Sequence, residues 1–268
     1  MDVIGADRAE PVVVERAAGA GGELVLRRAG ADYEIISNGM FLMDTRNGES
    51  ERLLVRAAVD ATLATGGNAE PVRVLIGGLG VGFSLAEALS HPAVGHVTVV
   101  EREPAVAAWH AGPLRPWSRG GLDDPRTALV LADLLDVLAD LLDVVATPPS
   151  AGTGPADVFD AVCLDIDNGP DWTVTPGNAR LYGPHGLDLL AGRLSPRGTL
   201  AVWSAGAAPG FADLLASRFA SVEALPVPVP RGEPDMVYLA RRPRPEPEPA
   251  PADRPRPDGS ADHAFGAR

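Results

Sequence analysis

The stretch VRVLIGGLGVGFSLAEAL, residues 72–89, decides the fold of this chain. An apolar run of strand length, 72–76, leads into a loop rich in glycine, and a helix is predicted directly after it. The loop glycines are Gly77, Gly78, Gly80 and Gly82. Glycine is needed where the backbone takes positive φ or where a ligand approaches the main chain, and the first turn of a helix offers free N–H groups. The pattern favours a ligand-binding loop over a plain tight turn between strand and helix.

Outward from this stretch, strands and helices alternate. The predicted strands are 72–76, 96–100, 128–131, 158–164 and 199–203. The predicted helices are 82–89, 104–110, 134–145, 186–194 and 208–219. Apolar strands that alternate with helices are typical of a parallel sheet covered on both faces. Two more strands, around 221–227 and 236–240, predict a terminal hairpin, one strand of which runs antiparallel at the sheet edge. The fold class is therefore α/β with a mostly parallel, seven-stranded sheet.

The chain before residue 67 is predicted to be a small β-rich region followed by a helix. Short strand patterns occur at 11–15, 23–27, 33–37 and 40–43, and residues 49–63 have apolar positions at helical spacing. We therefore expect a region at 1–66, a main domain at 67–240 and a tail at 241–268. The tail is rich in Pro, Arg and Glu, which predicts disorder.

Acidic residues follow two of the predicted strands. Glu101 ends the strand after the glycine-rich loop, where a carboxylate can accept hydrogen bonds from ribose hydroxyls. Asp133 follows the next strand, where it can accept a hydrogen bond from an adenine amino group, although an aspartate there is also a common helix N-cap. Together with the glycines, these acids predict a nucleoside pocket at the carboxyl edge of the sheet.

The glycine spacing narrows the choice of nucleoside. The glycines follow G-x-G-x-G and not the dinucleotide pattern G-x-G-x-x-G, and the chain contains no lysine to bind phosphate. Both observations argue against NAD and nucleoside triphosphates. They favour S-adenosylmethionine or a relative of it. An NAD-dependent dehydrogenase is further disfavoured because a catalytic Tyr–Lys pair is impossible without lysine.

A third acidic position follows the strand at 158–164. That strand delivers Asp165 to the same sheet edge, and Asp167 lies in the Gly/Pro loop that follows. Carboxylates here can steady a cationic sulfonium, or bind and deprotonate an attacking amine. The simpler alternative is an acid that caps the loop. We expect Asp165 and Asp167 to be catalytic because the loop opens where substrate must enter.

From about residue 72 to 240 the chain resembles spermidine synthase and other aminopropyltransferases. The resemblance rests on VLIGGLGVG, VTVVEREPAV, DPRTALVLAD, FDAVCLD and LSPRGTL, together with the β-rich N-terminal region. It implies a class I methyltransferase-type fold, a homodimer and aminopropyl transfer from decarboxylated S-adenosylmethionine to an amine. By the same resemblance Glu101 would hold the ribose, Asp133 the adenine and Asp165 the attacking amine.

The chain departs from that family's pattern on the acceptor side. The family typically has D-x-x-D-P after the fourth strand, whereas here Asn168 stands three positions after Asp165. Leu42, Glu51 and Arg52 stand where the family typically has Gln, Tyr and His. A cationic Arg52 would repel a diamine at close range. We therefore predict an amine acceptor that need not be putrescine, and keep a methyltransferase and a non-catalytic nucleoside-binding relative as alternatives.

Composition sets broad limits on function. The 268 residues carry 36 acidic and 23 basic side chains, a net charge of −13. Such a surface argues against nucleic acid as the main partner, because phosphate binding needs a basic face. Cys163 is the single cysteine, so neither an intramolecular disulfide nor a thiolate metal cluster is expected. Without a signal sequence or a long apolar run, we expect a cytoplasmic protein with no membrane segment and no metal.

Overall fold

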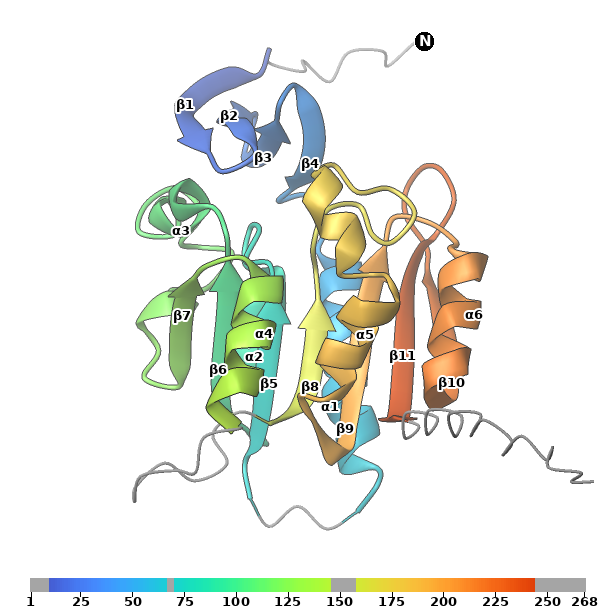
Figure 1. Cartoon of the computed structure of the whole chain (residues 1–268). Coiled ribbons are helices and arrows are strands. Elements are labelled where there is room, and N and C mark those ends of the chain that lie inside the picture. The colour runs from blue at the N-terminus through green and yellow to red at the C-terminus, as the bar shows by residue number, and fades with distance from the viewer. Residues whose placement is uncertain (1–9, 67–69, 146–157, 244–268) are drawn as a thin grey trace, which may run out of the picture.

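The structure of the chain is a computed structural model that describes residues 10–66, 70–145 and 158–243. These residues form a small sheet and a large sheet, and helices cover both faces of the large one (Figure 1). Most of the predicted tail lies outside the described residues; its first three residues, 241–243, extend the last strand. Within the described residues, none of the helices combines the length and apolarity needed to cross a bilayer.

The small sheet is made of four antiparallel strands in chain order. They are β1 (Val12–Gly19), β2 (Gly22–Ala29), β3 (Asp32–Ser37) and β4 (Met40–Asp44). Asn38 and Gly39 both have positive φ, as a two-residue turn between twisted antiparallel strands requires. This sheet lies beyond the carboxyl ends of the parallel strands, so one of its faces looks toward the edge where a ligand was predicted (Figure 1).

The first helix, α1 (Glu49–Leu63), has the predicted bounds 49–63. It packs against the large sheet and against the helix that follows the glycine loop. Leu54, Val55 and Ala58 are fully buried there. The helix therefore links the region 1–66 to the core of the main domain, and it starts beside the carboxyl edge of the large sheet.

The large sheet has seven strands in the order β10-β11-β9-β8-β5-β6-β7. The strands are β5 (Val72–Gly77), β6 (Val94–Glu101), β7 (Thr127–Leu131), β8 (Phe159–Leu164), β9 (Leu194–Ser204), β10 (Phe219–Val227) and β11 (Asp235–Pro243). The chain leaves β5 toward β6 and β7, then returns to the other side of β5 as β8. The carboxyl ends of β5 and β8 thus form the switch point at which open α/β sheets bind ligands.

The predicted terminal hairpin is present, and its antiparallel strand is β11. This strand pairs antiparallel with both β9 and β10, so it lies one place in from the edge and β10 is the edge strand. The expectation that the antiparallel strand lies at the edge is therefore wrong. The reason is that β11 pairs through both of its sides.

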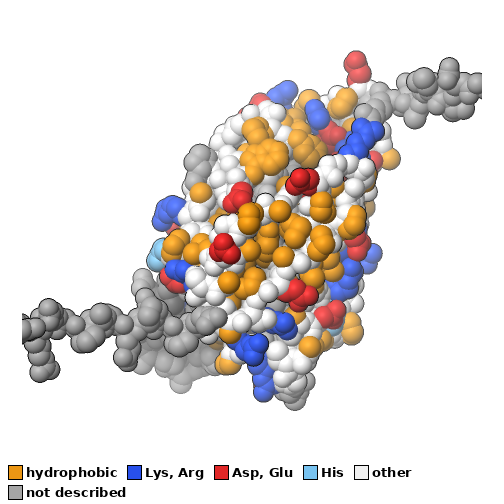
Figure 2. Space-filling model, turned by 90° about the vertical axis from the view of Figure 1, so that its right-hand side faces the viewer, with side chains coloured by type: hydrophobic (Ala, Val, Ile, Leu, Met, Phe, Trp, Pro, Cys, Tyr) orange, Lys and Arg blue, Asp and Glu red, His pale blue; other side chains and the backbone are white. Residues whose placement is uncertain are grey.

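Figure 2 shows the molecule from the β10 side, where apolar side chains are interspersed with acidic and arginine side chains.

The helices divide into two groups, one on each face of the large sheet. One face is covered by α1, α2 (Phe83–Ser90) and α3 (Pro104–Trp109), the other by α4 (Leu134–Val145), α5 (Pro184–Ala191) and α6 (Pro209–Arg218). Strand β5 shows how both faces are buried, because Val74 and Ile76 pack into one core and Leu75 into the other. This period-2 burial on both faces is why the strands are continuous apolar runs.

Candidate functional site

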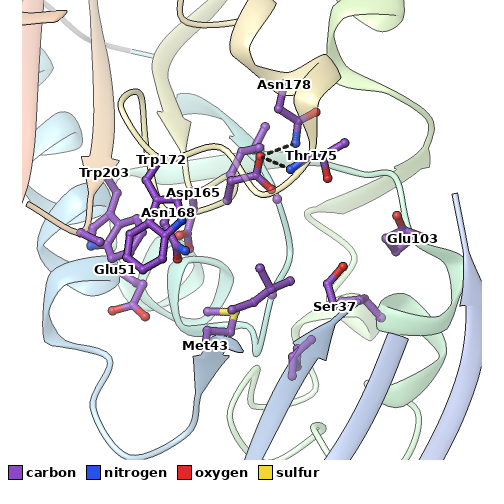
Figure 3. A pocket seen from close by; sticks show the side chains of 18 of the residues that line it. Ser37, Met43, Glu51, Glu103, Asp165, Asn168, Trp172, Thr175, Asn178 and Trp203 are labelled. Atoms are coloured by element: carbon purple, nitrogen blue, oxygen red, sulfur yellow. Dashed lines mark hydrogen bonds between the residues drawn. The ribbon is translucent and has the colours of Figure 1, made fainter. Parts of the chain in front are cut away.

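A cavity of about 810 Å³ lies between the small sheet and the carboxyl edge of the large one. Its walls come from β3 and β4, from the ends of β5, β6, β7 and β8, and from the loop that precedes β11. Its volume is in the usual range for a small-molecule site. Figure 3 shows Glu51, Asp165 and Trp203 at one end of this cavity and Ser37 and Glu103 at the other.

The glycine-rich loop enters the cavity through two of its glycines. Gly78 and Gly80 line it, with φ values of 92° and 50°. A Cβ at Gly78 would overlap the carbonyl oxygen of Asp165, and a Cβ at Gly80 would overlap the sulfur of Met43. Positive φ and close approach together exclude larger residues at both positions.

The other two predicted glycines do not line the cavity. Gly77 ends β5 and packs under the side chain of Leu134, while Gly82, at φ 95°, is the N-cap of α2. A Cβ at Gly82 would overlap His110 and Ser118. Gly77 and Gly82 therefore shape the loop from behind, and only Gly78 and Gly80 have access to a ligand.

Glu101 lies at the end of β6, as predicted, and is only 8% exposed. One carboxylate oxygen accepts a hydrogen bond from the N–H of Leu79 at 2.8 Å, and the other accepts one from the N–H of Glu103 at 2.7 Å. Burial raises the pKa of this carboxyl above its usual range. Each oxygen has a second lone pair, so the carboxylate is fixed in place and can still accept a ribose hydroxyl.

Asp133 fits both of the roles weighed for it. Its carboxylate accepts a hydrogen bond from the N–H of Leu135 at 2.9 Å, which caps the start of α4. Asp133 also lines the cavity, with Leu134 and Leu135 beside it. The cap fixes the carboxylate in the cavity lining, next to apolar side chains against which a flat ring could pack.

Asp165 follows β8 and lines the cavity at the end where Glu51 and Trp203 lie. The hydroxyl of Ser84, in the first turn of α2, donates to its carboxylate at 3.0 Å, and the N–H of Asp165 donates to the carbonyl of Gly77 at 2.8 Å. Burial raises its pKa to about 6, with further contributions from the charges of Glu101 and Asp235. A carboxyl with this pKa can gain or lose a proton near neutral pH, as a general acid or base must.

Asp167 lies in the same cavity but is bonded to its own loop. Its backbone is left-handed, with φ 53°, and one carboxylate oxygen accepts hydrogen bonds from the N–H of Thr175 and from the side-chain amide of Asn178 (Figure 3). These bonds hold the loop after β8 over the cavity. The structure thus gives Asp167 a loop-ordering contact, and its predicted catalytic role stays a prediction.

Ser50, Glu51 and Asp235 also line the cavity, close to Asp165. The sequence indicated Glu51 but neither Ser50 nor Asp235. The hydroxyl of Ser50 lies 2.9 Å from a carboxylate oxygen of Glu51 and 2.8 Å from one of Asp235. A hydroxyl has one proton, so Ser50 can donate to only one carboxyl and must accept from the other. One of the two carboxyls therefore carries a proton.

Glu51 is the carboxyl that best accounts for that proton. It is 7% exposed, and burial together with the nearby charges of Asp165 and Asp235 raises its pKa to about 8. Burial also raises the pKa of Asp235, against the opposing effects of Ser50 and the indole of Trp203. We define Glu51, Asp165 and Asp235 as the acidic triad. Within the described residues, no group of His, Cys, Asp and Glu is arranged so that it could hold a metal ion.

Arg52 does not face the cavity, contrary to the expectation that it would repel a diamine there. Its guanidinium lies over the ring of Phe83, 4.4 Å from the ring centroid, and Arg52 is not among the residues that line the cavity. Neighbouring residues on a helix point about 100° apart, so Glu51 can face the cavity while Arg52 turns away.

The Arg52→Met substitution tests this placement. It is expected to reduce the free energy of unfolding by about 0.5–1 kcal/mol, because the cation–π contact is lost while the apolar stem is kept. The affinity for an amine should stay within about twofold of the unsubstituted chain, since the guanidinium points away from the cavity. Urea denaturation and amine titration measure the two quantities, and a large gain in amine affinity would contradict the placement.

No family model matches the chain. A polyamine aminopropyltransferase of Mycobacterium tuberculosis (strain CDC 1551 / Oshkosh) is 30% identical over 194 residues, which cover 72% of this chain and 33% of that protein. Polyamine aminopropyltransferase 1 of Streptomyces coelicolor is 37% identical over 133 residues, which cover 49% of this chain and 22% of that protein. The chain thus spans a third or less of the length of these curated relatives.

Among solved structures, the crystal structure of spermidine synthase from Thermotoga maritima matches with a TM-score of 0.62 at 16% identity. The match covers 85% of this chain and 72% of that one. The predicted resemblance to aminopropyltransferases and the predicted α/β fold are both confirmed.

Proposed function

We propose that the chain is an aminopropyltransferase, which moves the aminopropyl group of decarboxylated S-adenosylmethionine to an amine. The observation that carries the proposal is a single cavity that contains the glycine loop, Glu101, Asp133 and the half-buried Asp165. The first three suit a nucleoside, and Asp165 suits the reacting amine. The similarity to polyamine aminopropyltransferases supports the same activity.

The reaction needs little beyond placement and one proton transfer. The amine nitrogen attacks the propyl carbon that is bonded to sulfur, so a C–N bond forms and the C–S bond breaks. The electron pair stays on sulfur, which becomes the neutral thioether of methylthioadenosine. The nitrogen must give up a proton, and we assign Asp165 to accept it and to orient the lone pair.

The charges in the cavity favour the decarboxylated donor over S-adenosylmethionine. The cationic side chains that line the cavity, within the described residues, are Arg102 and Arg231. Arg102 donates to Glu103 and to Thr175, at the end of the cavity away from the acidic triad. The extra carboxylate of S-adenosylmethionine would lie near the sulfonium and meet the triad, where like charges repel.

Donor binding is expected to follow this charge difference. Decarboxylated S-adenosylmethionine should bind at least about tenfold more tightly than S-adenosylmethionine, since 1.4 kcal/mol of repulsion corresponds to a factor of ten. Isothermal titration calorimetry with both donors measures the ratio. Methylthioadenosine, which lacks the propyl group, is the control for nucleoside binding alone. Equal affinities for the two donors would contradict the assignment.

The activity itself is tested by methylthioadenosine release from decarboxylated S-adenosylmethionine with a panel of amines. Release that depends on both the donor and an amine is the expected result. Formation of S-adenosylhomocysteine from S-adenosylmethionine would instead identify a methyltransferase. Tight nucleoside binding without turnover of any amine would identify a non-catalytic relative.

A further inference from the structure

Among the described residues, the negative charge at the proposed acceptor end of the cavity is concentrated in the acidic triad. The acidic triad surrounds the hydroxyls of Ser50 and Ser84, and it is where the ammonium of the acceptor would bind and give a proton to Asp165 before its nitrogen attacks. The decarboxylated donor brings one ammonium on its aminopropyl group, and the triad has to serve it as well as the amine that attacks. A diamine adds a second ammonium of its own, which needs a further carboxylate when it leaves water. The acceptor class therefore depends on whether another carboxylate is available in the cavity.

The other carboxylates that line the cavity are already engaged. Asp44 is paired with Arg46. Glu103 accepts from the N–H of Ala20 and from Arg102. Asp167 holds the loop through Thr175 and Asn178, while Glu101 and Asp133 lie on the nucleoside side and accept backbone N–H groups. Each of these carboxylates already accepts at least one hydrogen bond, so a second ammonium would have to compete with those bonds.

Neutral side chains line the cavity next to the triad. Asn168 is 7% exposed, and no hydrogen bond to its side-chain amide occurs within the described residues. Because Asn168 lines the cavity and its amide has no partner among the described residues, its hydrogen-bonding capacity is available to a ligand. Figure 3 shows Asn168 together with Trp172 and Trp203 at the Asp165 end of the cavity. Trp172 is 56% exposed, so an apolar group that covered it would remove a large apolar surface from water.

Among the described residues that line the cavity, the remaining charged side chain without an ion-pair partner is a cation. Arg231, in the loop before β11, lines the cavity, is exposed, and has no ion-pair partner within the described residues. A guanidinium repels a second ammonium, whereas it can lie against an aromatic ring. The positive charge of Arg231 and the neutral side chains of Asn168, Trp172 and Trp203 thus both disfavour a diamine.

We propose that the acceptor is a primary amine whose remaining part is uncharged and apolar or aromatic, and that diamines are poor acceptors. The ammonium binds at the acidic triad, and the rest of the molecule packs on Trp172 and Trp203 and reaches the amide of Asn168. This inference rests on the proposed aminopropyl transfer. It differs from that proposal because it sets which amines react.

The test uses the full chain with saturating decarboxylated S-adenosylmethionine and measures methylthioadenosine release. The acceptors are n-pentylamine, 2-phenylethylamine and 1,4-diaminobutane, of which the first and last have the same length. The two monoamines are expected to have kcat/KM values at least about tenfold above that of the diamine, because only the diamine buries an unpaired ammonium.

The outcomes separate the two proposals. A diamine that reacts as well as pentylamine or better overturns the acceptor inference and leaves aminopropyl transfer in place. Methylthioadenosine release with none of the three amines, from a chain that binds the donor, overturns both.

Two substitutions test the residues assigned to selectivity. Trp172→Ala should raise the KM for 2-phenylethylamine about five- to tenfold and leave the KM for the donor unchanged, because the indole contacts only the acceptor. Leu131→Ala is the matched control: Leu131 is 52% exposed, lies on the edge strand β7 and does not line the cavity. An unchanged KM in Trp172→Ala overturns the assignment.

Asn168→Asp should raise kcat/KM for 1,4-diaminobutane about tenfold by supplying the missing carboxylate.

Discussion

Replacing Asp165 with asparagine is expected to lower kcat for methylthioadenosine release by about 10²–10⁴-fold, the usual contribution of a positioned general base. The amide has the shape of the carboxylate and can still accept the hydrogen bond from Ser84, so the fold and the nucleoside pocket should persist. What is lost is the group that takes the proton from the amine. Steady-state kinetics with saturating donor and acceptor measure the loss.

The same carboxyl sets the acid limb of the pH profile. Because burial raises the pKa of Asp165 to about 6, kcat/KM should fall as the pH drops through that value and the base becomes protonated. Glu51 titrates near it with a pKa of about 8, so the limb reports the coupled group and not one residue alone. The limb should be absent from whatever activity remains in Asp165→Asn.

Two controls make the Asp165 result specific. Asp171→Asn removes a carboxylate from the same loop at an exposed position outside the cavity lining, and its kcat should stay within about twofold. Methylthioadenosine should bind Asp165→Asn within a few-fold of the unsubstituted chain. If Asp165→Asn retains full kcat, Asp165 is not the base and the proposed mechanism fails.

Replacing Glu51 with glutamine is expected to change how stability depends on pH. The pKa of Glu51 is about 8 in the folded chain, against an ordinary value of 4.5. Between these values the folded state keeps a proton that the unfolded state has lost, so the free energy of unfolding falls as the pH rises through this window. Glu51→Gln removes this titration, and its stability should decline less between pH 5 and pH 9, by a difference on the order of 2–4 kcal/mol.

Urea denaturation at pH 5, 7 and 9 measures this difference. Glu49→Gln is the matched control, because Glu49 lies two positions earlier in α1, where its side chain is exposed and paired with Arg56. Its stability should depend on pH as that of the unsubstituted chain does. A Glu51→Gln curve parallel to the unsubstituted one would show that Glu51 is ionised in the folded state across the whole range.

The part of the cavity that lies at the ends of the parallel strands could be predicted because local sequence specifies it. An apolar strand followed by glycines places a loop at a sheet edge, and an acid at the end of the next parallel strand must come to the same edge. Glu101, Asp133 and Asp165 all reach the cavity in this way. The homodimer and the cytoplasmic location that the sequence suggests stay predictions.

The part of the cavity around Ser50 and Asp235 could not be predicted from the sequence because it depends on long-range packing. Asp235 begins its strand, and only because β11 runs antiparallel does that beginning lie at the edge where the parallel strands end. Ser50 bonds Asp235 across most of the length of the chain. The orientation of Arg52 likewise followed from its contact with Phe83 and not from its position in the sequence.

The place of β11 between β9 and β10 also orders the assembly of the protein. Since β10 precedes β11 in the chain and pairs with the sheet only through it, neither can join the sheet until β11 has been synthesised. The cavity needs Asp235 from this last strand and also β4 and α1 from the first quarter of the chain. Pairing between such distant segments is slow, because loop closure must precede the contacts that reward it. We therefore expect that a nascent chain completes this cavity only after β11 has been synthesised and paired.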